Sequence, residues 1–204
     1  MPAQGRSSGF PAGVVLRMTL PFWEAVAVGC GLLYLILLVR GHVACWAFGI
    51  AASLITVFLY VDKKLYLEAV LNAYYVLAGV YGWWYWGRGG TVPVTEWSLN
   101  RHTAWLIACT ILSLGAGILM SRYTDSPRPY IDAALTVFSF LATWMEARKV
   151  LSGWYYWFVI NAVSVWLQWD RELYLFTAHS VLLTVLCVVG YFSWRKARQL
   201  EMTS

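Results

Sequence analysis

The stretch "VDKKLYL" at residues 61–67 recurs as "WDRELYL" at residues 169–175, and this repetition sets the expected fold. The offset between the copies is 108 residues, from Asp62 to Asp170. Without a gap, the same offset pairs further arginine, tryptophan and glycine positions: Arg40 with Arg148, Trp46 with Trp154, Gly82 with Gly190 and Trp86 with Trp194. Because these matches fall at the same places relative to the loops, the sequence indicates an internal duplication rather than coincidence.

The composition is that of a membrane protein, with 60% hydrophobic residues, 12% charged residues and a mean hydropathy of +0.60. Seven segments approach the roughly 20 apolar residues that cross hydrocarbon. They are residues 22–39, 43–61, 65–86, 103–120, 131–147, 150–169 and 173–194. We expect each to be helical, because lipid leaves no other way to pair backbone polar groups. The first and fifth carry an acidic residue near one end, Glu24 and Glu146.

The duplication predicts how these helices are grouped. We expect an all-α integral membrane protein with two parallel three-helix repeats joined by a central linker helix. The expected parts are an N-terminal tail (1–21), a first repeat (22–86), loops with a linker helix (87–129, helix about 103–120), a second repeat (130–194) and a C-terminal tail (195–204). Since three spans per repeat is an odd number, the lone fourth span gives both repeats the same orientation. Transporters use such repeats to hold one site near the bilayer midplane.

Charge and cysteine usage narrow the possible partners. The net charge of +5 sits in short loops, where Lys and Arg set membrane topology rather than bind nucleic acid. The two sides carry nearly equal numbers, and Arg195, Lys196 and Arg198 behind the last span favour a cytoplasmic C-terminus. The cysteines lie inside predicted spans, so we expect no disulfide, metal site or cofactor. They are Cys30, Cys45, Cys109 and Cys187.

One face of the sixth span carries a polar and aromatic stripe at helical spacing. Its members are Trp154, Trp157, Asn161, Ser164 and Gln168. Indole faces stack on planar rings and attract cations, and an Asn amide both donates and accepts. Trp154 suits an interfacial aromatic belt as well as a site. Trp157 and Asn161 lie well inside the span and favour a binding site over helix packing.

The third span carries a second stripe, formed by Glu68, Asn72, Tyr75 and Gly79. A carboxylate at the bilayer centre costs roughly 2.5–3.5 kcal/mol even on insertion scales, so Glu68 is a site candidate. Pairing with Lys63 or Lys64 at the interface is the alternative, and Asn72 lies deeper. At the other end of this span we expect Trp83 to close the site. Trp86, like Trp194, precedes basic residues and is interpreted as an interface anchor.

Three motifs together resemble the PnuC family of bacterial vitamin transporters. They are "YGWW.W" at residues 81–86, "W..W...N" at Trp154, Trp157 and Asn161, and the "LY" turn before the third and seventh spans. The resemblance covers about Trp23 to Lys196. It implies a seven-helix fold like that of SWEET transporters, a homotrimer in the bacterial inner membrane, and uptake of nicotinamide riboside by facilitated diffusion.

The resemblance also assigns substrate-binding residues. It implies stacking and amide roles for Trp154, Trp157 and Asn161, and places Asn72 where the family has Gln. The segment "LYLEAVLNAYY" at residues 65–75, with Glu68, is similar to the thiamine-transporting branch, so thiamine is the alternative substrate. An enzyme is not expected, since the spans show no HExxH and no paired Asp. A non-transporting scaffold would not need the Trp157 and Asn161 stripe.

Overall fold

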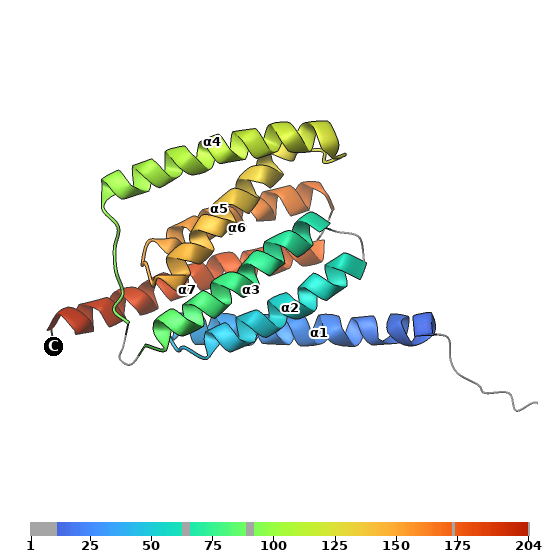
Figure 1. Cartoon of the computed structure of the whole chain (residues 1–204). Coiled ribbons are helices and arrows are strands. Elements are labelled where there is room, and N and C mark those ends of the chain that lie inside the picture. The colour runs from blue at the N-terminus through green and yellow to red at the C-terminus, as the bar shows by residue number, and fades with distance from the viewer. Residues whose placement is uncertain (1–11, 63–65, 89–91, 173, 204) are drawn as a thin grey trace, which may run out of the picture.

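The computed structural model describes residues 12–62, 66–88, 92–172 and 174–203. These residues form seven helices (Figure 1). The helices are α1 Ala12–Val39, α2 Cys45–Asp62, α3 Tyr66–Trp86, α4 Leu99–Tyr123, α5 Pro129–Ala147, α6 Gly153–Asp170 and α7 Tyr174–Thr203. They follow the predicted spans in order, so the expectation of an all-helical protein with seven helices is confirmed.

Membrane-crossing length is clearest in four of these helices. Among the described residues, long and apolar windows lie at Phe22–Val39, Cys45–Asp62, Leu99–Tyr123 and Thr177–Thr203, in α1, α2, α4 and α7. The other three helices, α3, α5 and α6, have 21, 19 and 18 residues.

The helices enclose an interior in a closed order. α2 packs between α1 and α3, and α6 packs between α5 and α7. α3 contacts α5, and α1 contacts α7, which completes the circuit. α4 packs mainly on α5, also contacts α6 through His102 and Tyr156, and lies along the outside of the bundle (Figure 1). The interior is therefore lined by every helix except α4.

Two glycine and tryptophan pairs hold neighbouring helices close together. A Cβ atom on Gly82 of α3 would overlap the ring of Trp46 on α2. A Cβ atom on Gly190 of α7 would overlap the ring of Trp154 on α6. Both indoles are almost fully buried. Close helix approach through small residues explains why these two glycines recur at the same offset as the two tryptophans.

Trp86 and Trp194 are not the interface anchors that the sequence predicted. Both are buried, and their indole nitrogens donate to backbone carbonyl oxygens, from Trp86 to Ala147 at 3.0 Å and from Trp194 to Leu38 at 2.9 Å. The first bond ties the end of α3 to the end of α5, and the second ties the body of α7 to the end of α1. The sequence did not predict these bonds because the two accepting carbonyl groups lie far from the tryptophans along the chain.

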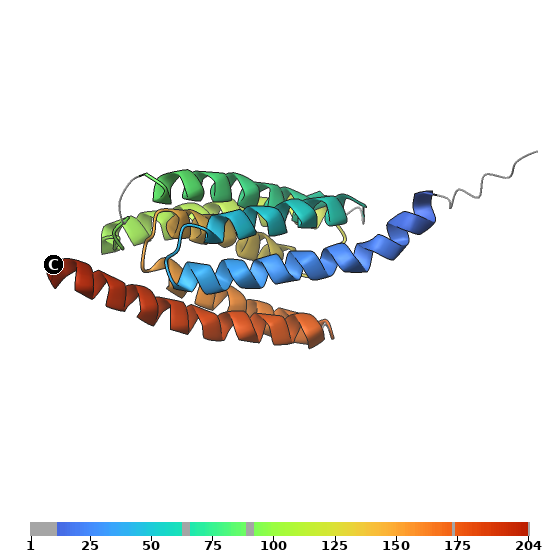
Figure 2. The ribbon, with the colours of Figure 1, turned by 90° about the horizontal axis from the view of Figure 1, so that it is seen from below.

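The C-terminal residues do not form the separate tail that was expected, because α7 continues to Thr203. Two contacts hold the extension against the segment before α4: Glu201 Oε2 accepts from the Val94 backbone nitrogen at 3.1 Å, and Arg198 pairs with Glu96. Figure 2 shows this end of α7 projecting beyond the neighbouring helices. The sequence from Arg195 to Met202 lacks Gly and Pro, so helix propensity carries the helix past the apolar segment.

Candidate functional site

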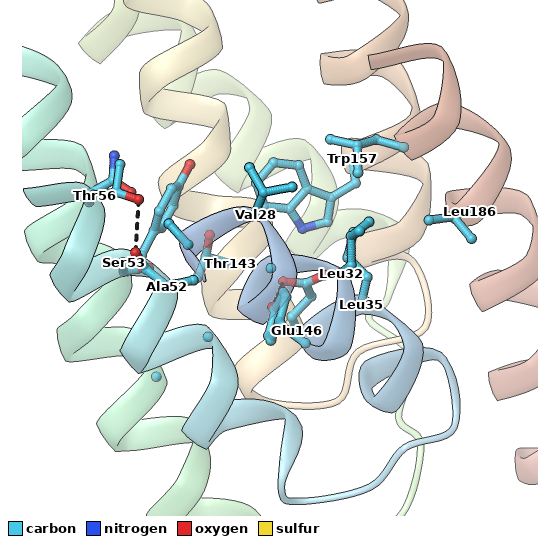
Figure 3. A pocket seen from close by; sticks show the side chains of 18 of the residues that line it. Val28, Leu32, Leu35, Ala52, Ser53, Thr56, Thr143, Glu146, Trp157 and Leu186 are labelled. Atoms are coloured by element: carbon cyan, nitrogen blue, oxygen red, sulfur yellow. Dashed lines mark hydrogen bonds between the residues drawn. The ribbon is translucent and has the colours of Figure 1, made fainter. Parts of the chain in front are cut away.

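A cavity of about 430 Å³ lies inside the circuit of helices. Its lining comes from α1, α2, α3, α5, α6 and α7 and is mainly apolar and aromatic. Figure 3 shows side chains from several of these helices converging on it. Sites for small molecules typically measure about 300–1,000 Å³ and combine apolar walls with a few polar groups. The cavity therefore has the size and composition of a site for one small organic solute.

The stripe on α6 supplies one wall of the cavity. Trp154, Trp157 and Asn161 all line it, as their spacing along one helix face requires. The Asn161 amide nitrogen lies 3.6 Å from the Cys187 sulfur on α7, a weak acceptor. The last predicted member, Gln168, lies outside the lining and accepts a hydrogen bond from the Ser180 hydroxyl at 2.8 Å. The stripe thus leaves the cavity beyond Asn161.

The stripe on α3 supplies a second wall. Asn72, Tyr75 and Gly79 line the cavity. The Asn72 amide nitrogen donates to the Glu68 backbone carbonyl oxygen at 2.9 Å. That bond holds the amide against the preceding turn of its own helix. The amide oxygen can still accept a hydrogen bond from a solute.

Two predicted site residues on α3 lie elsewhere. The Glu68 side chain is exposed and does not line the cavity. The alternative partners, Lys63 and Lys64, lie outside the described residues. Trp83 is 48% exposed and also lies outside the lining. Five of the eight expected residues, Trp154, Trp157, Asn161, Asn72 and Tyr75, are therefore brought together around one cavity.

Two indole N–H groups at the cavity, those of Trp46 and Trp154, have no hydrogen-bond partner among the described residues, and both nitrogens are buried. An indole N–H can only donate, and a buried donor left unpaired costs about 1–3 kcal/mol. Such donors are expected to meet acceptor atoms of a bound solute or of water in the cavity.

Glu146, at the end of α5, is a cavity residue that sequence reasoning missed. Its side chain is only 4% exposed. The Tyr34 hydroxyl of α1 donates to its Oε2 atom at 3.0 Å. Figure 3 shows the Trp157 indole nitrogen directed toward the Glu146 carboxyl group. The carboxylate therefore lies in the same space as the unpaired indoles.

Comparison with known proteins adds a family to this geometry. The chain matches the nicotinamide mononucleotide transporter family over residues 21–196. This chain belongs to that family. Nicotinamide riboside transporters named PnuC, from Escherichia coli (strain K12) and Shigella flexneri, are each 22% identical to it over 204 residues, covering 86% of this chain and 85% of theirs. The resemblance to the PnuC family is thus confirmed.

Two further relatives of this family member bear on fold and substrate. A riboflavin/roseoflavin transporter, RibM of Streptomyces davaonensis, is 26% identical over 101 residues, which is 46% of this chain and 47% of RibM. A crystal structure of the vitamin B3 transporter PnuC superposes with a TM-score of 0.71 at 19% identity, covering 94% of each chain. This family member therefore shares the fold of that transporter along nearly its whole length.

Within the family fold, the signal for Glu146 was present in the sequence but weak. An acidic residue in a predicted span is a site candidate by default. From the sequence, Glu146 is only an acidic residue near the end of the fifth predicted span. In the structure the end of α5 is covered by its neighbours, and Ala147 and Met145 beside Glu146 are fully buried. The position of a residue along its own helix therefore does not predict whether neighbouring helices bury it.

Proposed function

We propose that this chain is a multi-pass transporter of the bacterial inner membrane that takes up nicotinamide riboside by facilitated diffusion. Family membership supports a transporter. The observation that carries the proposal is the cavity of about 430 Å³, where the Trp154, Trp157 and Asn161 motif meets buried, unpaired indole donors. A nucleoside presents a flat ring to stack on indoles and several hydroxyl and amide oxygens that accept from them.

The proposed architecture is a three-plus-one-plus-three, SWEET-like arrangement, with α1–α3 and α5–α7 as parallel repeats and α4 as linker. Corresponding residues make corresponding contacts in support of it. Trp46 meets Gly82 as Trp154 meets Gly190. Trp86 reaches the end of α5 as Trp194 reaches the end of α1. The site then lies between two similar halves, as alternating access requires. A homotrimer with cytoplasmic C-termini completes the proposal.

The binding roles divide between the two halves. We assign stacking to Trp154 and Trp157, and polar contacts to Asn161, Asn72 and Tyr75. Facilitated diffusion fits the ionisable groups of the cavity, since Glu146 is the only carboxylate and His179 the only histidine among its described lining residues. A proton relay normally requires a chain of such groups.

Thiamine transport is the second candidate. Its thiazolium ring, like the pyridinium of nicotinamide riboside, is a planar aromatic cation, and one buried carboxylate in the cavity suits either. A non-transporting scaffold would leave the buried indole donors of Trp46 and Trp154 without an acceptor.

Uptake into liposomes that hold the purified full-length chain tests the function. Labelled nicotinamide riboside and thiamine are supplied side by side without an ion gradient. We expect nicotinamide riboside to enter until its internal concentration equals the external one. Uptake of thiamine alone would select the second candidate. If neither solute enters faster than into protein-free liposomes, the proposed function is wrong. An imposed proton or sodium gradient that drives accumulation would contradict facilitated diffusion.

A further inference from the structure

Glu146 occupies a position where the fold does not require charge. At the offset of 108 residues its counterpart is Leu38, and both side chains are buried, at 4% and 0% exposure. One half of the bundle thus fills this place with an apolar side chain and the other with a carboxylate. Since a leucine serves the packing at this position, the carboxylate calls for a further explanation. A buried carboxyl group stays ionised only when it is paired or well hydrogen-bonded, and otherwise it takes up a proton.

The described protein contacts of Glu146 meet only part of that requirement. An ionised carboxylate has about four acceptor positions; the Tyr34 hydroxyl fills one, and the Trp157 indole N–H is directed at a second. Arg128 pairs with Asp170, Arg171 with Asp132 and Arg198 with Glu96, so these three arginines do not neutralise Glu146. Lys149, three residues on, directs its ammonium group to the Val92 carbonyl oxygen at 2.8 Å. The side of Glu146 that remains open faces the cavity.

The aromatic walls around this carboxylate also favour a positively charged ligand. Trp154, Trp157 and Tyr75 line the cavity together with Glu146. The faces of aromatic rings attract cations, most strongly when water is excluded. A carboxylate beside flat aromatic walls therefore recognises a ring that is planar and positively charged.

We propose that Glu146 selects the charge of the solute, by balancing a planar aromatic cation in the cavity and so discriminating against the neutral form of the same molecule. This inference rests on the proposed function of the cavity as the solute site. It assigns the substrate class as N-substituted aromatic cations, which includes pyridinium and thiazolium compounds. It excludes neutral ring systems such as isoalloxazines as preferred solutes.

Binding titrations with charge-matched ligands test this. Nicotinamide riboside is a cation, and its 1,4-dihydro form is neutral with the same ribose and carboxamide. We expect wild type to bind the cation at least about tenfold more tightly than the dihydro form, because the buried charge pair is little screened. In Glu146→Gln the affinity for the cation should fall at least about tenfold, while that for the dihydro form changes less than about threefold.

Two variants guard against a general loss of folding. Glu172→Gln makes the same chemical change at an exposed turn and should retain wild-type affinities. Glu146→Asp keeps the charge and should retain a preference for the cation. If Glu146→Gln does not fold, the wild-type preference still decides, since equal affinity for the two forms would contradict charge selection.

Other outcomes separate this inference from the proposed function. Equal losses for both ligands in Glu146→Gln, or no loss for either, would overturn charge selection while wild-type binding of nicotinamide riboside upholds the function. If wild type binds neither form, nicotinamide riboside is the wrong solute, and thiamine with its uncharged 3-deaza analogue provides the same comparison. A selective loss of thiamine affinity in Glu146→Gln then supports the inference. Binding of no cation at all overturns both proposals.

Discussion

The indole nitrogen of Trp194 donates a 2.9 Å hydrogen bond to the carbonyl oxygen of Leu38, which lies at the last turn of α1. Both residues are buried, at 1% and 0% exposure. Trp194→Phe keeps most of the ring but removes this bond, while the Gly41 backbone N–H still donates to the Leu38 carbonyl oxygen at 2.8 Å. We expect the free energy of unfolding to fall by about 0.5–1.5 kcal/mol, the usual net contribution of one hydrogen bond. Thermal unfolding in detergent measures it, with Trp83→Phe at an exposed position as the matched control. Equal melting temperatures for the two variants would show that this bond contributes nothing.

Gly82 and Gly190 allow the closest helix approaches beside the cavity. Alanine at either position would overlap the ring of Trp46 or Trp154, so we expect Gly82→Ala and Gly190→Ala each to lower stability by about 1–3 kcal/mol. Gly115 on α4 has open space around its would-be Cβ atom. Gly115→Ala should be neutral or slightly stabilising, because Ala favours the helix. Destabilisation of all three variants to the same extent, in thermal unfolding, would argue against the close packing.

Trp157 and Asn161 carry the proposed contacts to the solute. Trp157→Ala and Asn161→Ala should each weaken solute binding by about 1–3 kcal/mol, because stacking and an amide hydrogen bond away from water are lost. Trp169 on the same helix is 64% exposed, so Trp169→Ala removes an equal ring outside the cavity. Isothermal titration calorimetry on folded variants compares them. A larger loss of affinity for Trp169→Ala would place the site elsewhere.

A Glu68 variant tests whether this residue contacts the solute or lies only at the membrane interface. Its side chain is exposed and lies outside the cavity lining. We therefore expect Glu68→Gln to bind both nicotinamide riboside and its neutral dihydro form within about twofold of wild type, since exposed charges are largely screened. A selective loss of affinity for the cation, in the same titration, would return Glu68 to the site and strengthen the case for thiamine.

The order and number of the helices were predictable because membrane crossing demands long apolar segments. The ends of the helices were harder to predict. α7 runs on to Thr203 because its charged end keeps high helix propensity, and apolar length alone does not detect that.

Within the site, helical spacing correctly grouped Trp154, Trp157 and Asn161 on one face, since that grouping is local. Helical spacing cannot predict contacts between segments that are distant in the sequence. Tyr34 and Glu146 are 112 residues apart, and Trp86 and Ala147 are 61 residues apart. A tryptophan before a basic residue is typical of a membrane interface, whereas contacts with α5 and with the rings of Trp46 and Trp194 bury Trp86.

A structure of the full-length protein with nicotinamide riboside bound tests most directly whether the cavity is the solute site. The account predicts the pyridinium ring against Trp157, with its positive charge near the Glu146 carboxylate and its oxygen atoms accepting from the indole nitrogens of Trp46 and Trp154. Solute density outside this cavity, for example in the smaller pocket beside Trp97 and His102, would contradict it.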